Sequence, residues 1–273
     1  MTSREWRSDR RAVFERDGYT CCNCSSVGGD DEPTAVRTYP VGDVPLEGTV
    51  HASSLVTVCS RCFSLLQTST DDSGGGIDRN ELFRIIRRAT RKQGPTISDA
   101  AAFASHVTSL PTALEGDDDP ATAYLETRRE VLLALDIVDA HLSRIETHQT
   151  ATLDQAIETS LAAFSEQAMT LQSELRTIVE LSETVLTGLG RCHGCFEPFE
   201  SDSSGESGPT PEPCRTCGLE SRPLSDWRRS GSDSALAFDR LFATINDRLQ
   251  ESSETTDALT DRTMALAAAL ADE

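Results

Sequence analysis

The sequence contains almost no lysine, few aromatic residues and no long apolar run. Lys92 is the only lysine, so the other 24 basic residues are arginine. Aromatic residues make up 5% and hydrophobic residues 37% of the 273 residues, so we expect one modest core, or several small ones supported by metals or helix pairing. No apolar run approaches the ~18 residues of a membrane helix, and the charged N-terminus lacks the apolar core of a signal peptide. We expect a cytoplasmic protein with no membrane contact and no evident small-molecule substrate.

Charge is distributed unevenly along the chain. The whole protein carries a formal net charge of −20 at pH 7. Residues 1–92 hold 13 basic and 13 acidic residues, so all of the excess negative charge lies in residues 93–273. Strong acidity with little lysine resembles proteins of salt-loving archaea, in which acidity serves solubility. If any part of the chain approaches a nucleic acid, we expect it to be the neutral first third.

The cysteines follow a regular pattern. Eight of the nine fall into Cys-x-x-Cys pairs, and only Cys22 is left over. A reducing compartment disfavours disulfides, whereas zinc knuckles require such pairs. Two pairs close a tetrahedral site without an open position for water, so the expected role is structural. We predict two Zn²⁺ sites, one formed by Cys21, Cys24, Cys59 and Cys62 and the other by Cys192, Cys195, Cys214 and Cys217. His193 lies between two of these ligands, and we expect it to face solvent.

The pattern of elements predicts an α+β, mostly α protein. Short β-branched runs at 34–41 and 53–58 indicate strands, and residues 4–17 indicate a helix that Gly18 ends. We expect five regions: a zinc-knuckle domain (1–70), a linker with a basic amphipathic helix at 78–93 (71–119), a long helix or helical hairpin (120–190), a four-cysteine zinc ribbon (191–231) and a C-terminal helix (232–273).

Apolar residues recur at alternating spacings of four and three over 131–145 and again over 157–189. This seam is typical of helices that pack in a coiled-coil manner. Between the two stretches lies either a turn, capped by Thr152, or a stutter in one helix. The segment 232–270 predicts a returning helix, so that the ribbon lies at the tip of a hairpin. Helices 157–189 and 232–270 could pair within the chain, with a second copy or with a protein partner.

A basic stripe lies on the helix predicted from Asp78, which Gly94 and Pro95 are expected to end. Another short helix is expected at 98–109. Because guanidinium groups bind phosphate through a planar fork, the stripe is our candidate nucleic-acid contact, with DNA as a candidate partner. The alternative is the solvated face of an amphipathic helix. The stripe consists of Arg84, Arg87, Arg88, Arg91 and Lys92.

The segments "RRAVFERDGYTCCNC" and "HASSLVTVCSRCF" resemble the zinc-knuckle subgroup of HNH endonucleases over roughly residues 4–66. The resemblance implies a ββα-metal fold and an ancestral contact with DNA. The residues at the catalytic positions of that family differ, however. Where that family keeps a His pair, an Asn and a final His, this chain has Arg37, Thr38 and Tyr39, then Ser54, then Phe63.

His51 is the only histidine in this region, and we expect it to cap or to lie in a loop. Without a metal-ligating set and a base, phosphodiester cleavage has no support. We therefore predict a non-catalytic, zinc-binding protein with a nucleic-acid-binding, regulatory or scaffold role. The alternatives are an active HNH endonuclease with relocated ligands and a coiled-coil assembly factor.

Overall fold

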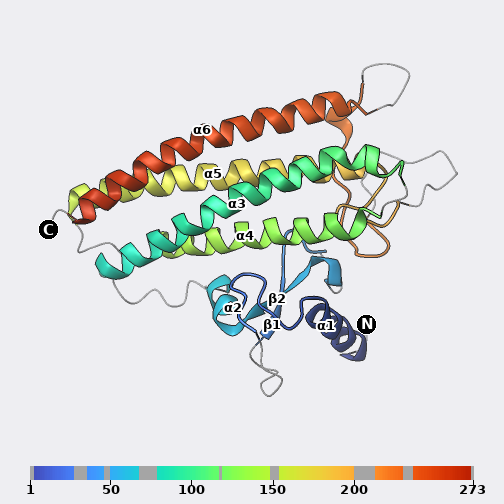
Figure 1. Ribbon diagram of the computed structural model, residues 1–273, viewed down its shortest axis with the longest axis horizontal. Coiled ribbons are helices and arrows are strands. Elements are labelled where there is room, and N and C mark those ends of the chain that lie inside the picture. The colour runs from blue at the N-terminus through green and yellow to red at the C-terminus, as the bar shows by residue number, and fades with distance from the viewer. Residues whose placement is uncertain are drawn as a thin grey trace.

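Four long helices lie side by side and form most of the protein (Figure 1). They are α3 (Arg79–Ala113), α4 (Ala121–Thr147), α5 (Gln155–Gly188) and α6 (Phe238–Ala271). The computed structural model describes residues 3–27, 36–45, 50–67, 79–116, 119–147, 154–199, 213–229 and 236–271. The predicted mostly helical α+β composition is confirmed. None of the described helices is long and apolar enough to cross a membrane.

The predicted apolar seams are buried within this bundle. Val131, Leu135, Val138, Leu142 and Ile145 of α4 are all buried, and so is the seam of α5 from Ile157 to Val185, with Leu189 partly buried. Residues 120–190 therefore form a hairpin of two helices. Thr152 lies outside the described residues, and α5 begins after Asp154. The returning helix α6 packs along α5 through Leu241, Ile245, Leu259 and Leu266, as expected.

Helix α3 continues through Gly94 and Pro95, so the predicted break there and the separate helix at 98–109 are wrong. The steric conflict that normally bars a helical residue before proline involves its Cβ, which Gly94 lacks. The Thr96 hydroxyl donates to the carbonyl of Lys92 at 2.8 Å. Beyond the proline, Phe103 and Val107 are fully buried in the bundle. Tertiary packing thus holds a continuous helix where local signals predict an end.

A smaller unit from the N-terminal part packs against α4 (Figure 1). It contains α1 (Ser3–Arg16), β1 (Val36–Pro40), a short 3-10 helix (Ala52–Ser54), β2 (Leu55–Cys59) and α2 (Ser60–Leu66). The strands pair antiparallel, with Arg37 opposite Val58. Gly18, with φ of +57°, follows α1 as predicted. The unit thus contains two antiparallel strands, of which the second leads directly into a short helix.

The end of α1 is fixed to β2 by two adjacent charged residues. The Asp17 carboxylate accepts a hydrogen bond from the backbone N–H of Thr57 at 2.8 Å. The Arg16 guanidinium donates to the carbonyls of Ala52 and Leu55 at 2.9 and 2.7 Å. These contacts hold the segment that follows α1, which carries the first cysteine pair, beside the strand that carries the second.

Candidate metal centres and basic groove

The first four-cysteine centre joins the turn after α1 to the end of β2. Cys21 and Cys24 lie on the turn, Cys59 ends β2 and Cys62 lies on α2. Their sulfur atoms all lie within 4.8 Å of one another, and those of Cys24 and Cys59 are 3.7 Å apart. The side-chain amide of Asn23 donates to the Cys62 sulfur at 3.2 Å. These four predicted ligands form a group that could hold a metal ion.

The second centre lies where α5 ends, on the segment that leads to α6. Cys192 and Cys217 have sulfur atoms 3.5 Å apart, and those of Cys195 and Cys214 are 3.6 Å apart. All four are at most 7% exposed. The backbone N–H of Gly194 donates to the Cys192 sulfur at 3.3 Å. The other four predicted ligands thus also form a group that could hold a metal ion.

Three of the four cysteine pairs share one backbone turn. In each, the N–H of the first cysteine donates to the carbonyl five residues later, and its own carbonyl accepts from the N–H four residues later. The residue after the second cysteine takes a left-handed conformation, with φ of 57° at Ser25, 67° at Phe196 and 75° at Gly218. This turn directs both thiols of a pair to the same side. The Cys59 pair differs because Cys59 precedes the first turn of α2.

The thiols within each centre have unequal acidity. Burial by itself would raise the pKa of Cys24, but hydrogen bonds from Ser26 and neighbouring thiols lower it to about 6. Hydrogen bonds from Cys192 and Cys195 lower the pKa of Cys217 to about 4. Each centre therefore contains a thiol inclined toward the thiolate, which is the form that binds metal. Cys22, although exposed, belongs to neither group, and partial desolvation of its thiol together with the negative charge of Asp17 raises its pKa to about 11.

A cavity of about 480 Å³ separates the first centre from α3 and α4. Cys24, Cys59 and Cys62 line one side of it. Among the described residues that line this basic groove there is no aspartate or glutamate, although the chain carries a net charge of −20. Its cations come from three helices and are Arg61 of α2, Arg88, Arg91 and Lys92 of α3, and Arg144 of α4.

Three of the five predicted nucleic-acid residues, Arg88, Arg91 and Lys92, lie in the groove. Arg84 and Arg87 do not line it, and Arg84 instead pairs with Glu81 at 3.2 Å. Lys92 also has a structural role, because its ammonium group donates to the side-chain and backbone oxygens of Asn23 at 2.6 and 3.1 Å. The first four-cysteine centre and α3 are thereby tied together beside the groove.

The groove also contains residues that the sequence analysis did not identify. Arg61 and Arg144 lie outside the predicted basic stripe, on other helices, so no periodic pattern connects them to it. Within the described part of the chain, no carboxylate forms an ion pair with Arg61, Arg88, Arg91 or Arg144. Burial and the charges of Arg88 and Arg144 lower the pKa of His141 to about 4, so His141 is neutral at pH 7.

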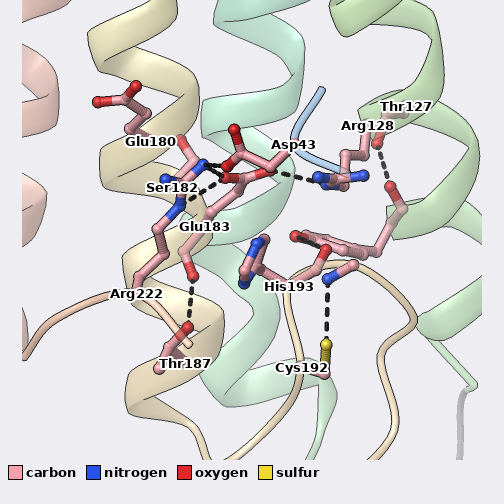
Figure 2. A network of polar contacts seen from close by, with 12 residues as sticks. Asp43, Thr127, Arg128, Glu180, Ser182, Glu183, Thr187, Cys192, His193 and Arg222 are labelled. Atoms are coloured by element: carbon pink, nitrogen blue, oxygen red, sulfur yellow. Dashed lines mark hydrogen bonds and ion pairs between the residues drawn. The ribbon is translucent and has the colours of Figure 1, made fainter. Parts of the chain in front are cut away.

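A buried ion-pair network lies near the second centre (Figure 2). Glu183 of α5 accepts hydrogen bonds from Arg128 of α4 at 2.7 Å and from Arg222 of the ribbon at 2.9 Å. Arg222 also pairs with Asp43 of the N-terminal unit at 2.7 Å. Burial alone would raise the pKa of Glu183, but the charges of Arg128 and Arg222 lower it to about 2. The network connects the N-terminal unit, the bundle and the ribbon.

The prediction that His193 faces solvent is wrong. Its side chain is 1% exposed and lies beside Glu183 (Figure 2), because the ribbon packs onto the end of the bundle. The Tyr124 hydroxyl donates to the His193 carbonyl at 2.9 Å. Asp43, Glu183 and His193 place potential ligand atoms within 4.8 Å of one another. Two guanidinium groups already neutralise these carboxylates, so an added cation would meet strong repulsion.

The positions that differ from the resembled HNH pattern make contacts of other kinds. The Arg37 guanidinium lies over the Phe63 ring at 4.9 Å, and the Thr38 hydroxyl accepts from Arg10 at 3.3 Å. His51 caps the short 3-10 helix, since its Nδ1 accepts from the Ser53 N–H at 3.2 Å, and the expected capping role is confirmed. Among the described residues, none of these positions belongs to a group of three metal-ligating side chains.

Comparison with known proteins adds no further constraint on function. No family model matches the chain, and searches of curated proteins and of solved structures find no match. Function is therefore inferred from the two four-cysteine centres, the basic groove and the ion-pair network alone.

Proposed function

We propose that this chain is a zinc-stabilised, non-catalytic nucleic-acid-binding protein, and that it contacts phosphate groups through the basic groove. The observation that carries the proposal is the charge of the groove. Five cations from three helices line one cavity together, without a lining carboxylate among the described residues, in a chain of net charge −20. Such a concentration of cations favours a polyanion.

The geometry of the two four-cysteine groups fits a tetrahedral metal ion, and zinc is the metal we propose. Zn–S bonds of about 2.3 Å in a tetrahedron place neighbouring sulfur atoms about 3.8 Å apart. The sulfur separations of 3.5, 3.6 and 3.7 Å are close to that value. They are far from the roughly 2.05 Å of a disulfide. Four thiolates close the coordination sphere, so the metal would supply folding energy and leave no open position for a substrate.

The cations of the groove exceed what the first metal centre needs. A zinc ion with four thiolates carries a formal charge of about −2, so two nearby cations would balance it. The groove holds five, of which Lys92 is committed to Asn23. The remaining arginines have planar donor groups that suit phosphate oxygens. Neutralising the metal centre therefore accounts for only part of the positive charge.

A catalytic role receives less support. Phosphodiester hydrolysis requires a base and a metal held on the scissile phosphate. The positions where the resembled nucleases keep such residues hold Arg37 and Phe63, in contact with each other, and His51 is engaged as a cap. Assembly through the helical seam also has less support, because the seam is buried within the chain's own bundle.

The test is a fluorescence-anisotropy titration of the zinc-loaded protein with labelled single- and double-stranded oligonucleotides over a range of KCl. Phosphate contacts from the four arginines predict a slope of log K against log salt of about −2.8 for single strands and about −3.6 for duplexes. The matched pair is Arg91→Gln, inside the groove, and Arg87→Gln, outside it on the same helix. We expect only Arg91→Gln to reduce the slope, by roughly one contact, with about a tenfold loss of affinity.

Two results would contradict the proposal. One is the absence of oligonucleotide binding at the lowest salt concentration, and the other is an equal effect of the two arginine substitutions. Metal analysis of the purified protein tests the zinc assignment separately, with about two zinc ions per chain as the expected result.

A further inference from the structure

The two four-cysteine centres differ in their exposure to solvent. The four cysteines of the second centre are 0 to 7% exposed, and the neighbouring Phe196 ring packs against Tyr124, with centroids 5.4 Å apart. In the first centre, Cys24 is exposed and Cys59 is partly exposed. Both line the basic groove, and their sulfur atoms are 3.7 Å apart. A small solute that enters the groove would therefore reach a pair of adjacent thiols.

We propose that Cys24 and Cys59 form an oxidation-sensitive site, where a peroxide converts the two thiolates to a disulfide, releases the metal of the first centre and weakens binding in the groove. This inference rests on the proposed zinc occupancy and nucleic-acid-binding function. It adds control of groove binding by oxidation. It also makes the first centre the reactive one and the second centre the inert one.

The reaction balances with a peroxide as the oxidant. One thiolate attacks a peroxide oxygen, the O–O bond breaks, and a sulfenic acid forms while the departing hydroxide takes a proton to become water. The second thiolate attacks the sulfenyl sulfur, an S–S bond forms, and a second hydroxide leaves and is protonated. Two electrons pass from the two sulfurs to the peroxide. The metal then loses two of its four ligands.

The surrounding charges favour this reaction. Arg61 is located between Cys59 and Cys62 in the sequence, and Arg88 and Lys92 line the same cavity. Cations beside the reacting pair stabilise the negative charge that develops on the departing hydroxide, and the metal-bound thiolate is the nucleophile that attacks the peroxide. In the second centre the four cysteines are at most 7% exposed, so we expect it to react much more slowly.

Loss of the first metal would disrupt one wall of the groove. That wall includes Asn23, Cys24 and Ser26 of the first cysteine turn. Asn23 accepts from Lys92 and donates to the Cys62 sulfur, so it connects α3 to the metal centre. The disulfide keeps Cys24 beside Cys59, but loss of the metal leaves Cys21 and Cys62 without a shared ligand. Asn23 would then lose its fixed position, and with it the contact that holds Lys92 at the groove.

The experiment uses the full-length, zinc-loaded protein treated with stoichiometric hydrogen peroxide. A chromogenic chelator reports zinc release, peptide mapping identifies the disulfide, and anisotropy reports oligonucleotide binding. We expect one zinc ion per chain to be released at least about tenfold faster than the second, together with a Cys24–Cys59 disulfide. Oligonucleotide affinity should fall with the first release and recover after reductant and Zn²⁺ are added.

Cys22→Ser supplies the matched control, because Cys22 is also exposed, lies between two ligands and belongs to neither centre. This variant should release zinc at the wild-type rate. Release of both zinc ions at the same rate, or oxidation confined to Cys22, would overturn the inference. A first centre without metal in the purified protein would overturn the zinc assignment as well. Ordered zinc release in a protein that binds no oligonucleotide would support the oxidation site but refute the nucleic-acid-binding function.

Discussion

The guanidinium carbon of Arg37 lies 4.9 Å from the centre of the Phe63 ring, which joins the start of β1 to α2. The HNH family that this segment resembles keeps histidines at these positions. A fixed positive charge over an aromatic face stabilises the packing of α2 on the sheet. The same charge opposes a divalent cation at that point, which agrees with a scaffold role for the N-terminal unit.

This contact predicts measurable coupling between two side chains. Arg37→Gln, Phe63→Leu and the double variant form a double-mutant cycle, and urea unfolding should give a coupling free energy of about 0.5–1 kcal/mol.

A separate prediction concerns catalysis: we expect purified wild-type protein to leave supercoiled plasmid intact with Mg²⁺ or Mn²⁺. Metal-dependent nicking that disappears in His51→Ala would instead support the nuclease alternative.

The second prediction concerns the continuity of α3. Within a helix, Pro95 removes one backbone hydrogen bond and its ring conflicts with the carbonyl of Arg91. Pro95→Ala should therefore raise the free energy of unfolding by about 1–3 kcal/mol, after the greater entropy of the unfolded chain is included. Urea unfolding measures the change, with Ser98→Ala, one turn later at an exposed position, expected to change it by no more than about 0.5 kcal/mol. An unchanged or lower stability of Pro95→Ala would indicate a helix end at this position.

The third prediction concerns the buried carboxylate. Glu183→Gln leaves the fully buried Arg128 without its counter-charge, so we expect a loss of about 3–5 kcal/mol at pH 7. Asp43→Asn removes an exposed partner of Arg222 and should cost at most about 1 kcal/mol. Urea unfolding measures the free energy of unfolding of both variants relative to the wild type.

The decrease in the free energy of unfolding in Glu183→Gln should depend on pH, and this dependence follows from the pKa of Glu183. Its pKa is about 2 in the folded protein and 4.5 when unperturbed, so its stabilisation is complete above pH 4.5 and is lost as the pH falls toward 2. Between pH 7 and pH 4, the stability gap between the wild type and Glu183→Gln should narrow by about 1 kcal/mol. A gap that stays constant or widens at pH 4 would contradict the assignment of the ion pair.

Some features could be predicted because their signals are local. The Cys-x-x-Cys spacing places both thiols of a pair close together, so the eight candidate ligands could be assigned from the sequence. The alternation of apolar residues along α4 and α5 likewise reports which faces are buried. Local signals failed at Gly94 and Pro95, where packing of the helix beyond the proline outweighs the cost of holding a proline inside the helix. The burial of His193 depends on the packing of the ribbon against the bundle, which no local pattern contains.

The sequence by itself determined the mostly helical composition, the two four-cysteine groups and the seams of the bundle, because ligand spacing and helical periodicity are properties of neighbouring residues. Only the tertiary structure decided which cations act together. Arg61, Arg88 and Arg144 belong to three helices and meet because the N-terminal unit packs against the bundle beside the first cysteine centre. The same packing leaves Cys24 exposed to the groove while the second centre is enclosed.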